Sequence, residues 1–139
     1  MTSISARASA LRPSFDGKKI IISYAEAGAE VSTIRVMNVD TKKFLPDSIY
    51  PSWFGPISWT FDNKAFTYFS QKTGDNTSPE FHINTKTRLH KLGDDEKNDI
   101  DFFSNESSPQ LNIQPNEMPF AGLNKDSRNY IFAHLENVR

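Results

Sequence analysis

The stretch SFDGKKIIISY, residues 14–24, decides the fold of this chain because variants of it occur twice more. The later copies are TFDNKAFTYFS at residues 60–70 and NKDSRNYIFAH at residues 124–134. In each copy a small polar residue stands two positions before an Asp, a turn former and a cation follow, and an apolar run comes next. A phrase that recurs at intervals of tens of residues is typical of stacked or radial repeats, one unit per phrase.

The polar half of each phrase is predicted to form a hairpin turn, because an Asp near the start of a turn bonds backbone amides ahead of it. The residue after the Asp must tolerate a left-handed backbone, which glycine does freely, asparagine fairly well and serine least. We interpret these positions as structural rather than catalytic or metal-binding. The pairs are Asp16 and Gly17, Asp62 and Asn63, and Asp126 and Ser127.

The segments between the turns indicate short strands, and helix-period patterns are nearly absent. Residues 33–39 alternate apolar and polar side chains, while residues 88–92 and 100–103 would form the outer two strands of the second unit. Four strands and about 45–60 residues per unit match a propeller blade. The predicted fold is therefore all-β, a partial β-propeller of about two and a half four-stranded antiparallel blades.

The expected organisation is an N-terminal segment, two blade-like units and the start of a third. The segments are residues 1–12, 13–55, 56–117 and 118–139. The N-terminal segment is expected to make a short helical turn that Pro13 stops. Pro46 is expected to end the first unit, because proline cannot donate to a strand ladder.

Composition narrows the classes of function. Lys plus Arg number 16 and Asp plus Glu number 17, so a net charge of −1 gives no footprint for nucleic acid or an anionic membrane. The absence of cysteine excludes disulfides and thiolate chemistry, and it fits a reducing compartment, so we expect a cytoplasmic protein. No stretch approaches the roughly 18 apolar residues of a membrane helix, and residues 1–11 lack the apolar core of a secretory signal.

Three groups of side chains are candidates for chemistry, and a structural role is the better interpretation of each. The histidines His82, His90 and His134 are interpreted as solvated or packing residues rather than metal ligands or acid–base groups. The acidic residues Asp94, Asp95, Glu96, Asp99 and Asp101 are interpreted as a solvated loop, because the glycine of a calcium-binding loop is absent. The aromatic residues Trp53, Phe54 and Trp59 are expected to pack in the core or between blades.

Two long phrases, residues 33–47 and 57–68, closely resemble the first propeller blades of the prolyl oligopeptidase family. Residues 88–93, with Asp99 and Ile100 after them, resemble the next blade element of that family. The resemblance covers residues from about 10 to 135. The chain departs from the family pattern at its turns. Phe15 and Phe61 replace the usual proline before the Asp, and Asn63 replaces the usual glycine.

Members of this family carry an α/β-hydrolase domain whose nucleophilic serine sits in a G-x-S-x-G elbow, and their propeller restricts entry to short peptides. No two of the six glycines here are four positions apart, so the chain has no such elbow and we expect no catalytic residue in it. The resemblance implies a non-catalytic propeller fragment of a serine peptidase that gates peptide access to a separate hydrolase domain. The alternative is a free-standing module that binds a protein or peptide.

No cofactor and no metal are expected. The expected partners are a hydrolase domain, peptides by family analogy, or further copies of the chain itself. Blade-like units cannot bury their apolar faces alone, and an incomplete third unit leaves a bare strand edge. We therefore expect a homo-oligomer unless another part of the protein covers these surfaces.

Overall fold

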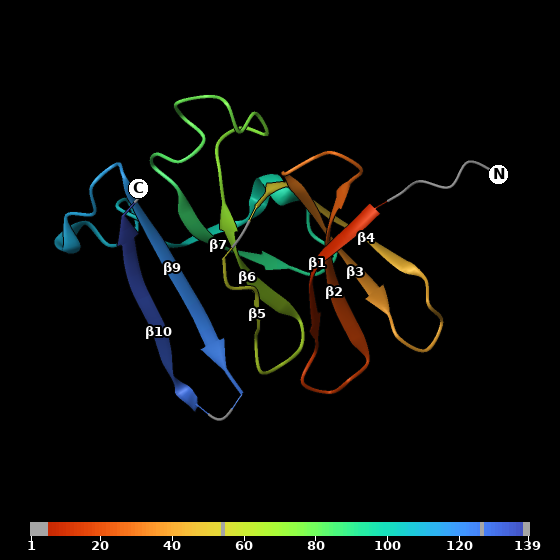
Figure 1. The fold of residues 1–139 in the computed structure, drawn as a ribbon. Helices are drawn as coiled ribbons and strands as arrows, with labels where there is room; N and C mark the ends of the chain where they lie inside the picture. Colours follow the sequence, from red (N-terminus) through yellow and green to blue (C-terminus); the bar gives the residue numbers. More distant parts are fainter. Residues whose placement is uncertain (1–5, 54, 126, 138–139) are drawn as a thin grey trace.

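The computed structural model describes residues 6–53, 55–125 and 127–137, which form three antiparallel sheets (Figure 1). The first sheet contains β1 (Ala6–Pro13), β2 (Lys19–Glu26), β3 (Ser32–Asn38) and β4 (Phe44–Ser52). The second contains β5 (Ser58–Trp59), β6 (Ala65–Ser70), β7 (Lys86–Lys91) and β8 (Ile100–Phe103). The third contains β9 (Glu117–Asn124) and β10 (Ser127–Asn137). These sheets confirm the predicted fold class.

Each four-stranded sheet is a meander in which consecutive strands pair, as expected for short strands joined by turns. The first hairpin of every sheet turns at the same end of the molecule (Figure 1). Two short 3-10 helices, η1 (Glu96–Asn98) and η2 (Pro109–Leu111), lie in the connections before β8 and β9. The repeated phrase of the sequence therefore occupies the equivalent position in each sheet.

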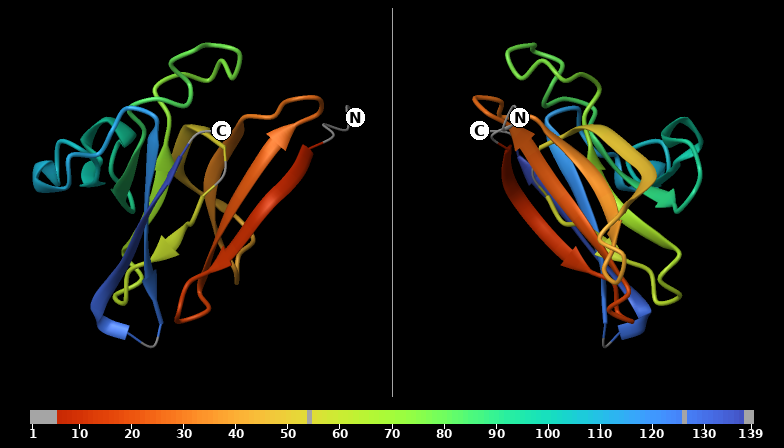
Figure 2. Two further views of the ribbon diagram at one scale, coloured as in Figure 1. Left: turned by 60° about the vertical axis from the view of Figure 1, so that its left-hand side comes forward. Right: turned by 90° about the vertical axis from the view of Figure 1, so that its right-hand side faces the viewer.

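The main hydrophobic core lies between the first and second sheets, which stack as successive layers (Figure 2). Alternation along β2 and β3 points every second side chain toward the neighbouring sheet. The first sheet contributes Ile21, Ile34, Val36 and Ile49, and the second sheet and its approach contribute Ile57, Trp59, Phe66 and Tyr68. Neither sheet buries this face without the other. We call this interface the seam.

The third sheet is joined to the second by two smaller apolar clusters. One contains Phe69, Met118 and Phe120, and the other contains Phe103, Ile113 and Ala121. Both clusters place side chains of β9 against the second sheet. The beginning of a third unit therefore packs on its predecessor as the second packs on the first.

The first sheet begins earlier than the sequence indicated. The helical turn expected in residues 1–12 is wrong for the described part, because Ala6–Pro13 forms β1 and pairs with β2. An isolated helical turn is marginal in water, whereas β2 offers a complete ladder of backbone partners. Leu11 lies opposite Ile22 in that ladder.

Pro46 does not end the first unit, contrary to expectation, because β4 continues to Ser52. Two features of β4 accommodate the proline. The strand lies at the edge of its sheet, and its register against β3 shifts between Arg35 and Met37, which leaves residues 45–47 outside the regular ladder. Proline is tolerated at edges and bulges because its missing N–H is not required there.

Within the part of the chain that the structure describes, both outer sides of the stack expose large apolar side chains. On β10, Tyr130, Ile131, Phe132 and Leu135 are all exposed, Tyr130 to 72%. On the first sheet, the guanidinium of Arg35 lies 4.6 Å from the ring centroid of Phe44, which is itself 49% exposed. Within the described ranges, no helix has the length and apolarity that spanning a membrane requires.

The seam core predicts a large loss of stability on truncation. Replacing the fully buried Phe66 with alanine should lower the free energy of unfolding by about 3–5 kcal/mol, because it leaves a cavity between the sheets. Tyr130→Ala is the matched control, since that exposed side chain should contribute within about 0.5 kcal/mol. Denaturant midpoints measure both. Equal losses in the two variants would show that the core does not lie in the seam.

Candidate functional site

The first repeated turn is held by one serine hydroxyl and one carboxylate. The hydroxyl of Ser14 donates to Oδ1 of Asp16 at 2.6 Å, and the amide of Lys18 donates to the same oxygen at 3.0 Å. The amide of Lys19 donates to Oγ of Ser14 at 3.0 Å. Gly17 has a φ of 72°, in the left-handed region. These bonds close the turn between β1 and β2.

The second turn reproduces this arrangement closely. The hydroxyl of Thr60 donates to Oδ1 of Asp62 at 2.6 Å, the amide of Lys64 donates there at 3.0 Å, and Asn63 has a φ of 59°. In both turns these hydrogen bonds lower the pKa of the Asp carboxyl. The bond from the Ser or Thr hydroxyl has the larger effect, and the bond from the Lys amide has the next largest. The carboxylates are thus occupied by their own turns.

The third turn is only partly described. Asp126 lies outside the described residues, and Ser127 begins β10 opposite Asn124. Lys125 occupies the position of Phe15 in the first phrase and Phe61 in the second.

The first two turns also bind each other. The rings of Phe15 and Phe61 stack with centroids 5.7 Å apart. The amide of Asp16 donates to Oδ1 of Asn63 at 3.2 Å, so the residue that replaces the family's usual glycine spans the gap between turns. Close by, Nε1 of Trp59 donates to the carbonyl of Arg12 at 2.8 Å. The repeated phrase therefore joins neighbouring sheets as well as closing hairpins.

The most distinctive polar cluster lies buried in the seam and was not foreseen. His90 on β7 places Nε2 2.7 Å from Oδ1 of Asp47 on β4, and Nδ1 2.7 Å from Oδ1 of Asp99, which immediately precedes β8. All three side chains are 1% exposed. One imidazole ring thus bridges carboxylates from both sheets.

Two further groups donate hydrogen bonds to the carboxylates of this cluster. The hydroxyl of Tyr68 donates to Oδ2 of Asp99 at 2.6 Å, and the amide of Gly93 donates to Oδ1 of Asp47 at 2.7 Å. Burial, and then the hydrogen bond to Asp99, raise the pKa of Tyr68, which keeps its proton as a donor. Oδ2 of Asp47 has no hydrogen-bond partner among the described residues.

The geometry sets the charge of His90. A carboxylate only accepts hydrogen bonds, so a ring with a carboxylate at each nitrogen must carry both protons. Burial alone would lower the pKa of His90, but the hydrogen bonds to Asp99 and Asp47 outweigh it and hold that pKa above its ordinary value of 6.5. The seam therefore contains an imidazolium between two carboxylates.

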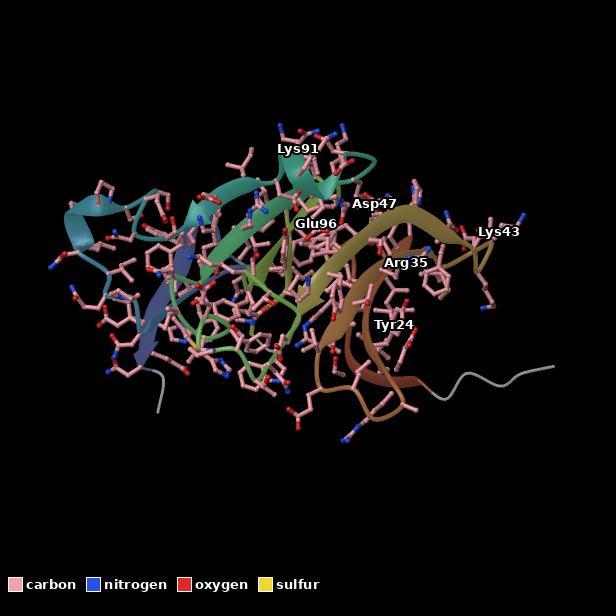
Figure 3. All side chains as sticks on the ribbon, turned by 90° about the horizontal axis from the view of Figure 1, so that it is seen from above. Tyr24, Arg35, Lys43, Asp47, Lys91 and Glu96 are labelled. Carbon is pink, nitrogen blue, oxygen red and sulfur yellow. The ribbon has the colours of Figure 1, made fainter. Side chains whose placement is uncertain are left out.

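Beside this cluster, the chain is hollowed into a pocket of about 400 Å³ lined by residues 46–48 and 93–96. Figure 3 shows Asp47 and Glu96 side by side where the first sheet meets the second. Burial, and then the charge of Asp99, raise the pKa of Glu96, while a hydrogen bond from the amide of Tyr50 opposes this. Among the described residues no set of side chains is arranged to hold a metal ion.

The structure divides the candidates that the sequence grouped together. The interpretation of Asp99 as a solvated loop residue is wrong, because it is buried between Tyr68 and His90. Of the other histidines, His82 packs at a tilt of 52° against Trp53 with ring centroids 4.7 Å apart, and His134 is exposed near Glu136.

The aromatic candidates also divide. Trp59 packs in the seam core, as predicted, and Trp53 is half-buried against Phe81, whereas Phe54 lies outside the described residues.

One sequence signal could have identified the buried cluster around His90. Asp47 stands two positions before the apolar Ile49 on one strand, which places its carboxylate on the core face.

A family comparison agrees with this architecture. The family described as prolyl oligopeptidase, N-terminal beta-propeller domain, matches residues 6–117. The chain belongs to this family. The match confirms the resemblance seen in the sequence, and the catalytic domain of such enzymes lies outside the matched region.

Solved structures show the same fold. A prolyl endopeptidase matches with a TM-score of 0.79 and 23% identity, over 96% of this chain and 19% of its own. Prolyl oligopeptidase B from Galerina marginata gives 0.78 and 22%, over 95% and 19%. Oligopeptidase B from Leishmania major gives 0.70 and 17%, over 94% and 16%. The chain thus spans about a fifth of the length of these enzymes or less.

The turn geometry predicts which substitution is costly. Gly17→Val should lower the free energy of unfolding by about 1–2 kcal/mol, because a β-branched residue is strained at positive φ. Apart from its two chain neighbours, no described residue has an atom within 4 Å of the Cβ that a side chain would add at Gly17, so the loss would come from the backbone alone.

Lys18→Val is the control for that substitution, since it places the same side chain on the next, exposed residue. The urea midpoints of unfolding of the two variants measure this difference in stability. A loss that is equal for residues 17 and 18 would contradict the importance of the left-handed position.

Proposed function

We propose that this chain is a non-catalytic part of the propeller of a prolyl-oligopeptidase-like serine peptidase, which gates peptide access to a separate α/β-hydrolase domain. The observation that carries the proposal is the stack of two four-stranded sheets with a third begun, in a chain matched to that propeller family over residues 6–117. Gating requires a wall that holds its shape. The seam and the joined turns supply such a wall.

The polar chemistry of the chain supports a scaffolding role. The carboxylates of Asp16 and Asp62 are occupied by their own turns, and those of Asp47 and Asp99 by His90. The 139 residues contain no nucleophile elbow. The reaction would therefore depend on residues outside this chain, and the contribution of the chain would be selection by size.

A transplant tests this proposal. In prolyl oligopeptidase B from Galerina marginata, the segment that this chain matches would be replaced by residues 6–137. The chimera should keep cleaving a short proline-containing peptide and should leave a folded protein intact, whereas the same host with the segment deleted should lose this size selection.

The chain alone should hydrolyse nothing and should not react with a fluorophosphonate probe for activated serines. Stoichiometric labelling of any serine in the isolated chain would overturn the non-catalytic assignment. A folded chimera that cleaves large proteins as readily as short peptides would overturn the gating role and leave a binding module as the better assignment.

The exposed β10 strand supports a proposal about partners. Its apolar side chains, and the edge that pairs with no other described strand, need a covering layer, which the hydrolase-bearing remainder of such a peptidase or a second copy of this chain would provide. For the isolated chain we expect a dimer or larger ring, because only another copy is present to cover these residues.

Light scattering coupled to size exclusion measures this association. At tens of micromolar the chain should elute as an oligomer, and Phe132→Lys should shift it toward the monomer, because the substitution places a charge on the exposed face. Lys43→Arg, at an exposed turn of the first sheet, is the control. A folded monomer that unfolds cooperatively and binds no hydrophobic dye would contradict self-association.

A further inference from the structure

We propose that His90 is a proton-dependent clamp between the two four-stranded sheets, whose imidazolium holds β4 of the first sheet against β7 of the second. Loss of the ring proton would release Asp47 and loosen the seam at β4. This inference concerns the chain itself and does not depend on the proposed function.

The clamp works across the seam because its two carboxylates belong to different sheets. Asp99 directly precedes β8, which pairs with the strand that carries His90, and the hydroxyl of Tyr68 also holds Asp99 within the second sheet. Asp47 comes from the first sheet, and 43 positions separate it from His90. Of the two contacts that His90 makes with carboxylates, the one with Asp47 is therefore the one that joins the two sheets.

A neutral imidazole carries one proton, so one of the two 2.7 Å contacts would then set a ring lone pair against a carboxylate oxygen. Asp99 has Tyr68 as a second partner, on its other oxygen. Asp47 would keep only the amide of Gly93, and its Oδ2 has no partner among the described residues. A buried carboxylate with so few donors is unfavourable and gains by reaching water.

The position of Asp47 allows such a movement. Among the described residues, β4 is the outer strand of its sheet and pairs only with β3. Its ladder is already irregular beside residues 45–47. The pocket lined by residues 46–48 and 93–96 adjoins the same point and offers space. The carboxylate could therefore turn toward solvent while the apolar core of the seam stays in place.

The groups that face His90 favour its charged form. Asp47 approaches from β4, Asp99 from the start of β8, and Tyr68 from β6 by way of Asp99. The more distant carboxylates of Asp94 and Glu96 also act on the ring. Two further groups lie close by: Phe66 packs on the ring with centroids 5.3 Å apart, and Arg88, whose positive charge opposes the charged form, donates to the carbonyl of Asp99.

The sign of the pH dependence follows from these partners. Because the folded pKa of His90 lies above 6.5, the clamp contributes its full stability below that pH. The contribution is lost as the pH rises through the folded pKa. The seam should therefore be firmest below about pH 6.5 and should weaken as the pH rises through the folded pKa of His90.

Nuclear magnetic resonance of the full chain tests the clamp. At about pH 6 both ring nitrogens of His90 should carry protons, and the ring should titrate above its ordinary pKa. Hydrogen exchange at the amide of Gly93 should quicken through that titration by more than it does at amides within β6. A ring that is neutral at about pH 6 would overturn the proposal.

Matched variants separate the clamp from a merely structural histidine. Asp47→Asn should lower the pKa of His90 and remove the change in Gly93 exchange, and His90→Gln should remove the pH dependence of the unfolding midpoint through this range. His134→Gln changes an exposed histidine and should behave as the parent chain does. The same pH dependence in parent and Asp47→Asn would overturn the clamp, even if His90→Gln failed to fold.

Discussion

The structure depends on one interface, the core shared by the first two sheets. Ile21 and Ile34 of the first sheet share one buried cluster with Trp59 and Phe66 of the second, so this core belongs to both sheets. Apolar contacts alone would allow the layers to slide. The contacts of His90 with Asp47 and Asp99 are directional, and they fix β4 against β7 in one register.

The repeated phrase has two tasks in this architecture. Within a hairpin, the hydroxyl and carboxylate satisfy the turn amides, which explains why Ser14 and Thr60 occupy equivalent positions. Between hairpins, Phe15, Phe61 and Asn63 hold adjacent turns together. The residues that depart from the family pattern at these positions therefore make contacts between the two sheets. They close the seam at the end of the molecule where the hairpins turn.

The sequence was informative where neighbouring residues determine the outcome. Alternation and turn chemistry predicted β3, β6, β7 and β8, and the long phrases at residues 33–47 and 57–68 indicated the family. It failed where distant residues decide. The segment of β1 has no strong strand pattern of its own, and it forms a strand because its backbone pairs with that of β2. The pairing of Asp47 with His90 links residues that are 43 positions apart in the sequence. Asp99 looked like its exposed acidic neighbours because only tertiary packing buries it.

The paired turns also set the mechanical character of the stack. The joint between the first two units has stacked aromatic rings at its hairpin end, but the third phrase has Lys125 where an aromatic ring stands in the others. A lysine side chain cannot form such a ring stack, so this contact is repeated at the hairpin ends of the first two units and stops there. For a force that spreads the layers, the stacked rings would therefore resist at the hairpin end of the first joint, and other contacts would have to do so at the second.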